Sequence, residues 1–327
     1  MNINLFASGL RSIFLALCAT ACTQSFAQNW PTKPLTIVAV FSPGGPVDLV
    51  ARIVAKGLAE QLGQQVIVDN RVGAGGTVGA ASVARANPDG YTVLLVNSGH
   101  TAAESLYKGR QYDLVKDFLP VSLIGTSPNW LLINPKQHAF ASMQELVNYA
   151  ITNPGKLTYA SGGSGGLTHL SSELMKTQKN LDILHVPYKG NAPAFTDLLA
   201  GRVDMIFDQP IASEAFVKAG QLKPLAVTSR VRAPGYPDVP TMMESGFPNF
   251  NVDVWYGLAF RAGTPPSVVT ALNTALEKVL STADVKNRLI AAGVTPAPGT
   301  PLAFEVRIKD DVARWRAIIE RTGITAQ

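Results

Sequence analysis

Cysteine is nearly absent from this chain of 327 residues, and its placement excludes two kinds of chemistry. The two cysteines, Cys18 and Cys22, lie in an N-terminal segment that we expect to be removed, which leaves no disulfide and no thiolate. Histidine is also scarce, and the four histidines, at positions 100, 138, 169 and 185, lack the paired spacing of metal ligands. The sequence therefore predicts neither a bound metal nor a cofactor.

Charged residues are few as well, at 16% of the chain, and they are scattered. No run of basic residues is interleaved with aromatic ones, so binding to nucleic acid is not expected. The net charge of +5 falls by one, to +4, if Arg11 is lost with the N-terminal segment. This mild positive excess favours attraction of anions.

Long apolar runs are missing except near the N-terminus, where residues 13–22 have the length of a signal-peptide core. Small residues at the two positions that a signal peptidase reads predict cleavage after Ala27 and export to the periplasm. The apolar run is too short to span a bilayer after cleavage. A lipid anchor on Cys22 is the alternative, although the three residues before it lack the expected leucine.

The length of the chain favours two lobes, because one core rarely extends over so many residues. Short apolar runs alternate with amphipathic stretches, which predicts an α/β fold with a mostly parallel sheet in each lobe, flanked by helices. Crossing segments at residues 120–126 and 247–260 divide the chain. We expect lobe 1 at residues 28–124 plus 253–327 and lobe 2 at residues 125–252, with a ligand cleft between them.

The first glycine-rich turn joins the first predicted strand to the first predicted helix. Gly44 and Gly45 leave backbone N–H groups without a neighbouring Cβ, and Pro46 suits the first helical position. A helix that begins with exposed amides attracts an anion. Asp48 complicates this site, because a capping carboxylate competes with the anion for the same amides. We expect these four residues and Ser42 to contact the ligand.

The second glycine-rich turn also joins a strand to a helix, and it offers three hydroxyl groups and several exposed amides for a carboxylate. Its expected ligand contacts are Ser161, Gly162, Gly163, Ser164, Gly165, Gly166 and Thr168. One such turn is as often structural as functional, whereas two of them, one in each lobe, favour a site in the cleft.

A third glycine-rich stretch at residues 70–79 suggests a dinucleotide site but does not match its fingerprint. Val78 stands where the third glycine is required, and no lysine follows the glycines as in a phosphate-binding loop. We interpret the stretch as a structural loop near the mouth of the cleft.

A periplasmic serine hydrolase is the enzyme alternative, because the second turn places Ser164 in the G-x-S-x-G pattern of a nucleophile elbow. Such an enzyme needs an acid and then a histidine farther along the chain. His169 lies on the helix that the serine would open, and His185 follows Asp182 by three residues. No histidine comes later, which argues against a catalytic triad and predicts a protein that is not an enzyme.

Ordered segments along nearly the whole mature chain resemble the Bug-type receptors of tripartite tricarboxylate transporters. The matching segments are residues 31–38 with 43–48, 69–71 with 73–76, 88–92, 159–162, 185–190, 204–208, 240–241 with 244–246, and 255–258. Each segment alone is common, but the ordered set is specific.

The resemblance implies a type II-like periplasmic binding protein that closes over a small carboxylate, either a di- or tricarboxylate or an aromatic acid. It also implies delivery to integral-membrane transporter subunits, and we expect a monomer. Further contacts are implied at the ends of other strands, at Asn97, Ser98, His100 and Asp208. Val47 departs from the small hydroxyl residue that the resemblance leads us to expect. A sensory co-receptor that binds the same ligand for a signalling partner is a further alternative.

Overall fold

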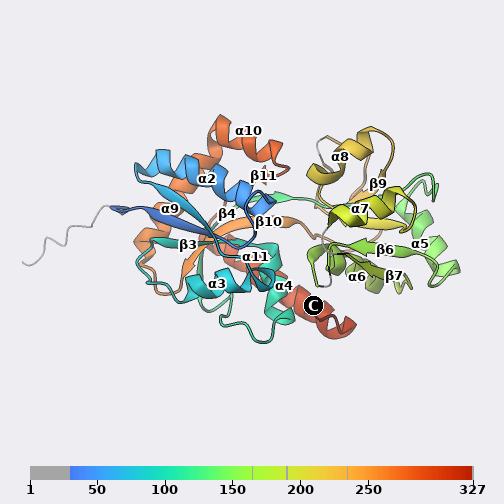
Figure 1. The fold of residues 1–327 in the computed structure, drawn as a ribbon, viewed down its shortest axis with the longest axis horizontal. Helices are drawn as coiled ribbons and strands as arrows, with labels where there is room; N and C mark the ends of the chain where they lie inside the picture. Colours follow the sequence, from blue (N-terminus) through green and yellow to red (C-terminus); the bar gives the residue numbers. More distant parts are fainter. Residues whose placement is uncertain (1–29, 164, 189–190, 234, 326–327) are drawn as a thin grey trace, which may run out of the picture.

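The computed structural model describes residues 30–163, 165–188, 191–233 and 235–325. The predicted signal peptide of residues 1–27 and Ser164 lie outside these residues. The described chain forms two lobes that stand side by side, each built on one sheet with helices on both faces (Figure 1). The predicted two-lobe α/β fold is confirmed.

Lobe 1 contains a six-stranded sheet with the order β11-β4-β10-β3-β1-β2. Its strands are β1 (Leu35–Ala39), β2 (Val66–Asn70), β3 (Thr92–Asn97), β4 (Phe118–Ser127), β10 (Val254–Arg261) and β11 (Thr295–Pro296). Its helices are α2 (Pro46–Leu62), the short 3-10 helix η1 (Ala74–Gly76), α3 (Thr77–Ala84), α4 (Ser98–Leu106), α9 (Pro266–Ser281), α10 (Ala283–Ala291) and α11 (Pro301–Thr322). Side chains from α2, α9 and α10 pack on one face, and side chains from α3 and α11 pack on the other. Burial on both faces explains why β1 and β3 are continuous apolar runs in the sequence.

Lobe 2 contains a five-stranded sheet with the order β7-β6-β8-β5-β9. Its strands are β5 (Trp130–Ile133), β6 (Thr158–Ser161), β7 (Leu184–Pro187), β8 (Met205–Asp208) and β9 (Lys223–Val227). Its helices are α5 (Met143–Thr152), α6 (Leu167–Lys179), α7 (Asn191–Leu199) and α8 (Pro210–Lys218). Residues of α5 and α6 pack on one face of this sheet, and residues of α7 and α8 pack on the other.

Most strands of each sheet run in the same direction, as predicted, but each sheet also contains antiparallel neighbours. β1 pairs in parallel with β2 and β3, and β6 pairs in parallel with β7 and β8. β10, however, is antiparallel to both β3 and β4, and β5 is antiparallel to both β8 and β9. The chain leaves lobe 1 along β4 and returns along β10, so the two strands run in opposite directions side by side. The predicted limits of the lobes stay a prediction.

The last helix, α11, belongs to the cores of both lobes. Phe304, Ile308 and Val312 pack on the sheet of lobe 1, while Trp315 and Ile318 are buried in the core of lobe 2. The connection between the lobes is tied to the same helix. The Trp255 Nε1–H donates to Asp311 Oδ2 over 2.7 Å, and Arg314 Nη1 donates to the carbonyl of Asn251 over 2.6 Å.

Within the described parts of the chain, no helix is both long enough and apolar enough to cross a membrane. Those same parts contain no group of three or more histidine, aspartate or glutamate side chains arranged to hold a metal ion.

Candidate functional site

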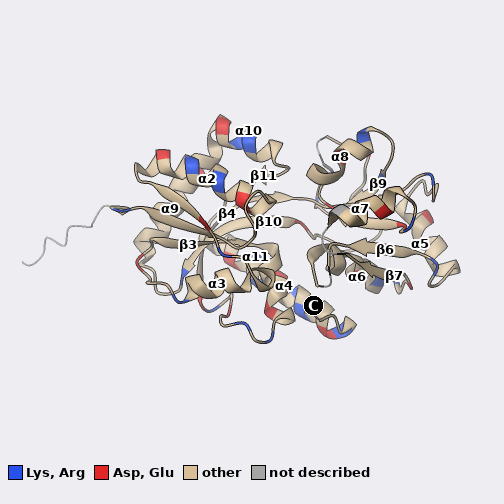
Figure 2. Ribbon diagram, in the orientation of Figure 1, with Lys and Arg blue, Asp and Glu red and all other residues tan. Residues whose placement is uncertain are grey.

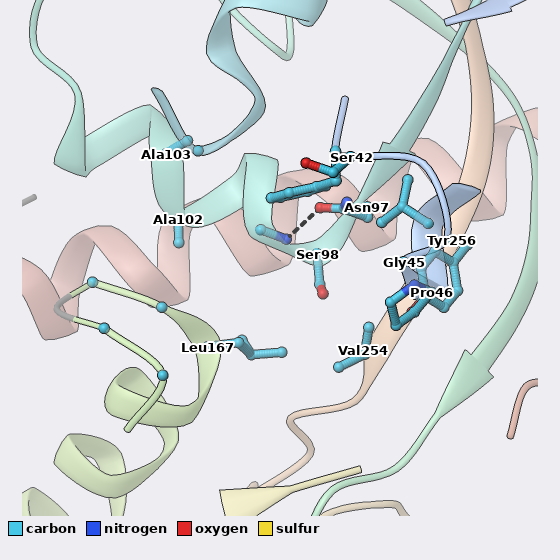
Figure 3. A pocket seen from close by; sticks show the side chains of 18 of the residues that line it. Ser42, Gly45, Pro46, Asn97, Ser98, Ala102, Ala103, Leu167, Val254 and Tyr256 are labelled. Carbon is cyan, nitrogen blue, oxygen red and sulfur yellow. Dashed lines mark hydrogen bonds between the residues drawn. The ribbon is translucent and has the colours of Figure 1, made fainter. Parts of the chain in front are cut away.

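A cavity of about 760 Å³ lies between the lobes, at the carboxyl ends of β1, β3, β6 and β8, where open α/β sheets bind ligands. Lobe 1 and β10 contribute Phe41, Ser42, Pro43, Gly45, Pro46, Val47, Gly75, Asn97, Ser98, Gly99, Ala102, Ala103, Leu106, Tyr107, Val254 and Tyr256 to its lining. Lobe 2 contributes Gly162, Gly163, Gly165, Gly166, Leu167 and Gln209. Figure 3 shows side chains from both lobes converging on this space.

The first glycine-rich turn is held by Asp48, whose side chain is 3% exposed and is absent from the cavity lining. The amide of Gly44 donates to Asp48 Oδ2 over 2.9 Å, and Arg52 Nε donates to the same oxygen over 2.8 Å. Asn70 Nδ2, from the end of β2, donates to Asp48 Oδ1 and to the carbonyl of Phe41. The bond from Arg52, with those from Gly44 and Asn70, lowers the pKa of Asp48 to about 2, so this carboxylate is ionised.

The expected capping of α2 by Asp48 is not found, although Asp48 does occupy the Gly44 amide of the turn. Asp48 points back to the turn and to Arg52, and the N-cap of α2, Gly45, has no side-chain cap among the described residues. Since the first amides of a helix have no intrahelical partner, the amide of Val47, a residue of the cavity lining, is not used within α2. Pro46 occupies the first helical position, as predicted.

Helix α6 follows the second glycine-rich turn, and its N-terminus resembles that of α2. Its N-cap is Gly166, and no side chain in the described part of the chain caps it. Helix α4 differs, because the Asn97 side chain accepts from the Gly99 amide over 2.9 Å (Figure 3). His100 completes this cap by accepting the Asn97 amide at Nδ1. Two bare helix N-termini, one from each lobe, thus face the cavity.

A stack of three rings stands behind the second turn. The ring centroids of His169 and His185 lie 3.9 Å apart, and Tyr159 stacks on His185 at 4.8 Å. His185 Nε2 lies 2.7 Å from Ser161 Oγ, and the Gly165 amide donates to His169 Nδ1 over 2.9 Å. Burial lowers the pKa of His169 to about 4 and also lowers the pKa of His185, so both rings are neutral near pH 7. Neither histidine is part of the cavity lining, and both contact the turn.

Asp208 supports the second turn from farther inside lobe 2. It is 3% exposed, and Asn191 Nδ2 donates to its Oδ1. Its Oδ2 has no hydrogen-bond partner among the described residues, and burial raises the pKa of Asp208 to about 7. A Cβ on Gly162 would overlap with Asn191 Oδ1, so Asn191 lies directly behind the turn. Asp208 and Asn191 are not part of the cavity lining, whereas Gln209, the residue after Asp208, is part of it.

The structure brings most of the sequence-predicted residues to the cavity. Nine of them are part of its lining: Ser42, Gly45, Pro46, Asn97, Ser98, Gly162, Gly163, Gly165 and Gly166. The others that are described are not part of the lining: Gly44, Asp48, His100, Ser161, Thr168 and Asp208. His100 is fully buried, which lowers its pKa to about 4, and Thr168 Oγ1 accepts from the Gly162 amide over 3.4 Å. The direct contact of these residues with a ligand stays a prediction.

Sequence reasoning missed the apolar part of the lining. Ala102, Ala103 and Leu106 lie on α4, Leu167 begins α6, and Val254 begins β10. The spacing on α4 resembles an ordinary buried helix face, so no signal distinguished it from core. Gly75 also lines the cavity, which places the third glycine-rich stretch beside it.

The chain matches proteins of one family along nearly its whole length. The model described as "Tripartite tricarboxylate transporter family receptor" matches residues 50–324. A protein of the tcbD–tcbE intergenic region of a Pseudomonas species is 39% identical and covers 97% of this chain and 94% of its own length. Protein BugT of Bordetella pertussis is 35% identical over 95% of both chains. An R. palustris protein whose structure was solved with adipate has a TM-score of 0.77 at 36% identity, covering 91% of this chain and 100% of its own.

Proposed function

The chain belongs to the tripartite tricarboxylate transporter receptor family, of the Bug type, and from this premise we propose that it captures a small carboxylate between its lobes for a membrane transporter. The family is one of solute receptors and not of enzymes, so the serine hydrolase alternative is set aside. A related receptor was solved with adipate, which supports a carboxylate as the ligand.

One observation carries the proposal: the N-termini of α2 and α6 open at the same cavity from opposite lobes. Each presents amides without an intrahelical partner and the positive end of a helix dipole. A carboxylate has two oxygens and accepts several hydrogen bonds at once. One such group placed between the two helices draws the lobes together, because each lobe supplies donors that the other cannot replace.

The location and partners follow from the same premise. We propose that the signal peptide is cleaved after Ala27, that the mature protein is a periplasmic monomer, and that it delivers its ligand to integral-membrane subunits. A sensory role for the same ligand stays the alternative, and it is distinguished by whether uptake of the ligand stops when the gene is deleted.

The outer helices α2, α10 and α11 bear acidic and basic side chains (Figure 2).

The proposal is tested by giving α2 a cap of its own. Gly45 has φ −79° and ψ 170°, which an aspartate adopts without strain, and its ideal Cβ lies 3.3 Å from the nearest atom, Ser42 O. The Gly45→Asp side chain then accepts the free amides and repels a ligand carboxylate. Charge-assisted hydrogen bonds contribute about 1.5–3 kcal/mol each, so we expect affinity to fall at least tenfold. The free energy of unfolding should change by less than about 1 kcal/mol.

Gly109→Asp is the matched control, because it adds the same charge where an added Cβ has open space around it. A thermal-shift screen of mono-, di- and tricarboxylates and aromatic acids first identifies a ligand, and titration calorimetry then compares the variants. Equal affinities of the two variants would show that the N-terminus of α2 does not hold the carboxylate. If no acid in the panel raises the melting temperature, the proposed function is wrong.

A further inference from the structure

Part of the cavity lining is apolar, and it borders the N-terminus of α6. Ala102, Ala103 and Leu106 share one side of α4, and Leu167 and Val254 continue this surface from α6 and β10. Figure 3 shows Leu167 pointing across the cavity toward Val254, with Ala102 above them. We call these five residues the apolar wall.

The apolar wall is held firmly in place. Ala102 is 3% exposed and packs with the core of lobe 2, and Leu106 and Leu167 are partly buried against that same core. An ideal Cβ on Gly165 would lie 3.0 Å from Leu106 Cδ1, so the end of α4 already contacts the second turn. Because core side chains are close-packed, we expect this surface to keep its shape when a ligand binds.

The distribution of charge complements the apolar wall. Among the described residues, no acidic, basic or histidine side chain lines the cavity. The polar groups of the lining include the side chains of Ser42, Asn97, Ser98 and Gln209 and the uncapped starts of α2 and α6. A carboxylate placed against the apolar wall would lose its water without gaining a partner, which is costly. Methylene or aromatic carbons placed there would gain affinity, by about fourfold for each methylene buried.

We propose that the ligand is a monocarboxylate with an apolar body, whose single charged end lies between α2 and α6 and whose alkyl or aromatic part lies on the apolar wall. This inference rests on the proposed receptor function and narrows its ligand class. It departs from the di- and tricarboxylates that the family description suggests. The volume of about 760 Å³ is within the range of pockets that enclose ligands of this size.

The central comparison of the test is between hexanoate and adipate, which have chains of equal length and differ only at one end. Titration calorimetry measures butanoate, hexanoate, 3-phenylpropanoate, adipate and malate against the full mature chain, with hexanamide as the uncharged analogue of hexanoate. We expect hexanoate to bind at least tenfold more tightly than adipate and about 15-fold more tightly than butanoate, since two more methylenes are buried. Hexanamide should not bind measurably.

Leu106→Lys then places a cation on the apolar wall. Leu106 is the last residue of α4, where a positive charge is favourable, so the fold should be retained, as circular dichroism and urea unfolding check. We expect hexanoate to weaken at least tenfold and adipate to become the preferred ligand. Ser105→Lys is the matched control, because it adds the same charge one residue away, at a position outside the cavity lining. It should leave the preference for hexanoate unchanged.

The outcomes separate the two proposals. Tighter binding of adipate or malate than of hexanoate by the unaltered chain overturns the apolar-body inference and leaves the receptor function standing. An unchanged preference in Leu106→Lys overturns the assignment of the apolar wall. Failure of every acid to bind refutes the receptor function itself.

Discussion

Removing the negative charge of Asp48 should weaken the fold by a calculable and pH-dependent amount. The carboxylate is 3% exposed and accepts from Gly44, Arg52 and Asn70. Its pKa of about 2 in the folded protein, against 3.8 for the free side chain, corresponds to about 2.5 kcal/mol at 1.36 kcal/mol for each unit. The Asp48→Asn variant loses this contribution, because its amide keeps neither the charge nor both acceptor oxygens.

The sign of the pH dependence follows from the lowered pKa of Asp48. The stabilisation is fully present above the unfolded pKa near 4 and is lost as the pH falls through about 2. The difference in unfolding free energy between the original chain and Asp48→Asn should be about 2.5 kcal/mol at pH 7 and about half of that at pH 3. Urea unfolding followed by circular dichroism at both pH values measures it.

Asp284→Asn is the matched control for this experiment. Asp284 also has an arginine four residues later, Arg288, but the two charged groups are 3.7 Å apart and the Asp284 side chain is 67% exposed. An exposed pair of this kind contributes about 0.5 kcal/mol or less. A difference for Asp48→Asn below about 1 kcal/mol at pH 7, or one that stays constant down to pH 3, would refute the account of Asp48 as the anchor of the first turn.

Two further predictions concern buried side chains of lobe 2. Burial raises the pKa of Asp208 to about 7, so between pH 4 and 7 this carboxyl loses its proton in the unfolded chain but keeps it in the folded one. The free energy of unfolding should therefore fall over this range by up to about 1.4 kcal/mol per pH unit. Asp208→Asn should flatten that slope in urea unfolding between pH 4.5 and 7.5, and an unchanged slope would contradict the assignment. Trp315→Ala should lower the free energy of unfolding by about 3–5 kcal/mol, because loss of a side chain that is 1% exposed leaves a cavity in the core of lobe 2. A loss below about 1 kcal/mol in the same urea-unfolding assay would show that α11 does not support that lobe.

The two glycine-rich turns at the cavity could be located from the sequence because their pattern is local. In the first turn, two adjacent glycines after an apolar run are followed by proline and a helical pattern, which is typical of a helix N-terminus with exposed amides. The partners of Asp48 were not predictable, since Asn70 arrives from β2 only in the folded protein. The role of Asp48 as an anchor rather than a cap therefore required the structure.

The apolar wall and the antiparallel strands were missed for a different reason. Ala102 and Leu106 have the spacing of any core-facing helix, and only tertiary contacts reveal that part of this face borders a cavity. The direction of β10 likewise depends on its place between β3 and β4, which no local pattern records. Local sequence patterns thus predict where a glycine-rich turn and a helix start lie, while the apolar part of the cavity is assembled from distant segments.

The positions of β10 and α11 in the chain also determine when, during synthesis, each lobe can complete its fold. β10 occupies the place between β3 and β4, yet the ribosome makes it only after all of lobe 2. Until it arrives, β3 and β4 both lack this neighbour, which leaves strand edges open to wrong pairing. The core of lobe 2 in turn waits for Trp315 and Ile318. We therefore expect neither lobe to complete its fold, and the growing chain to remain dependent on holding chaperones, until the last helix has been synthesised.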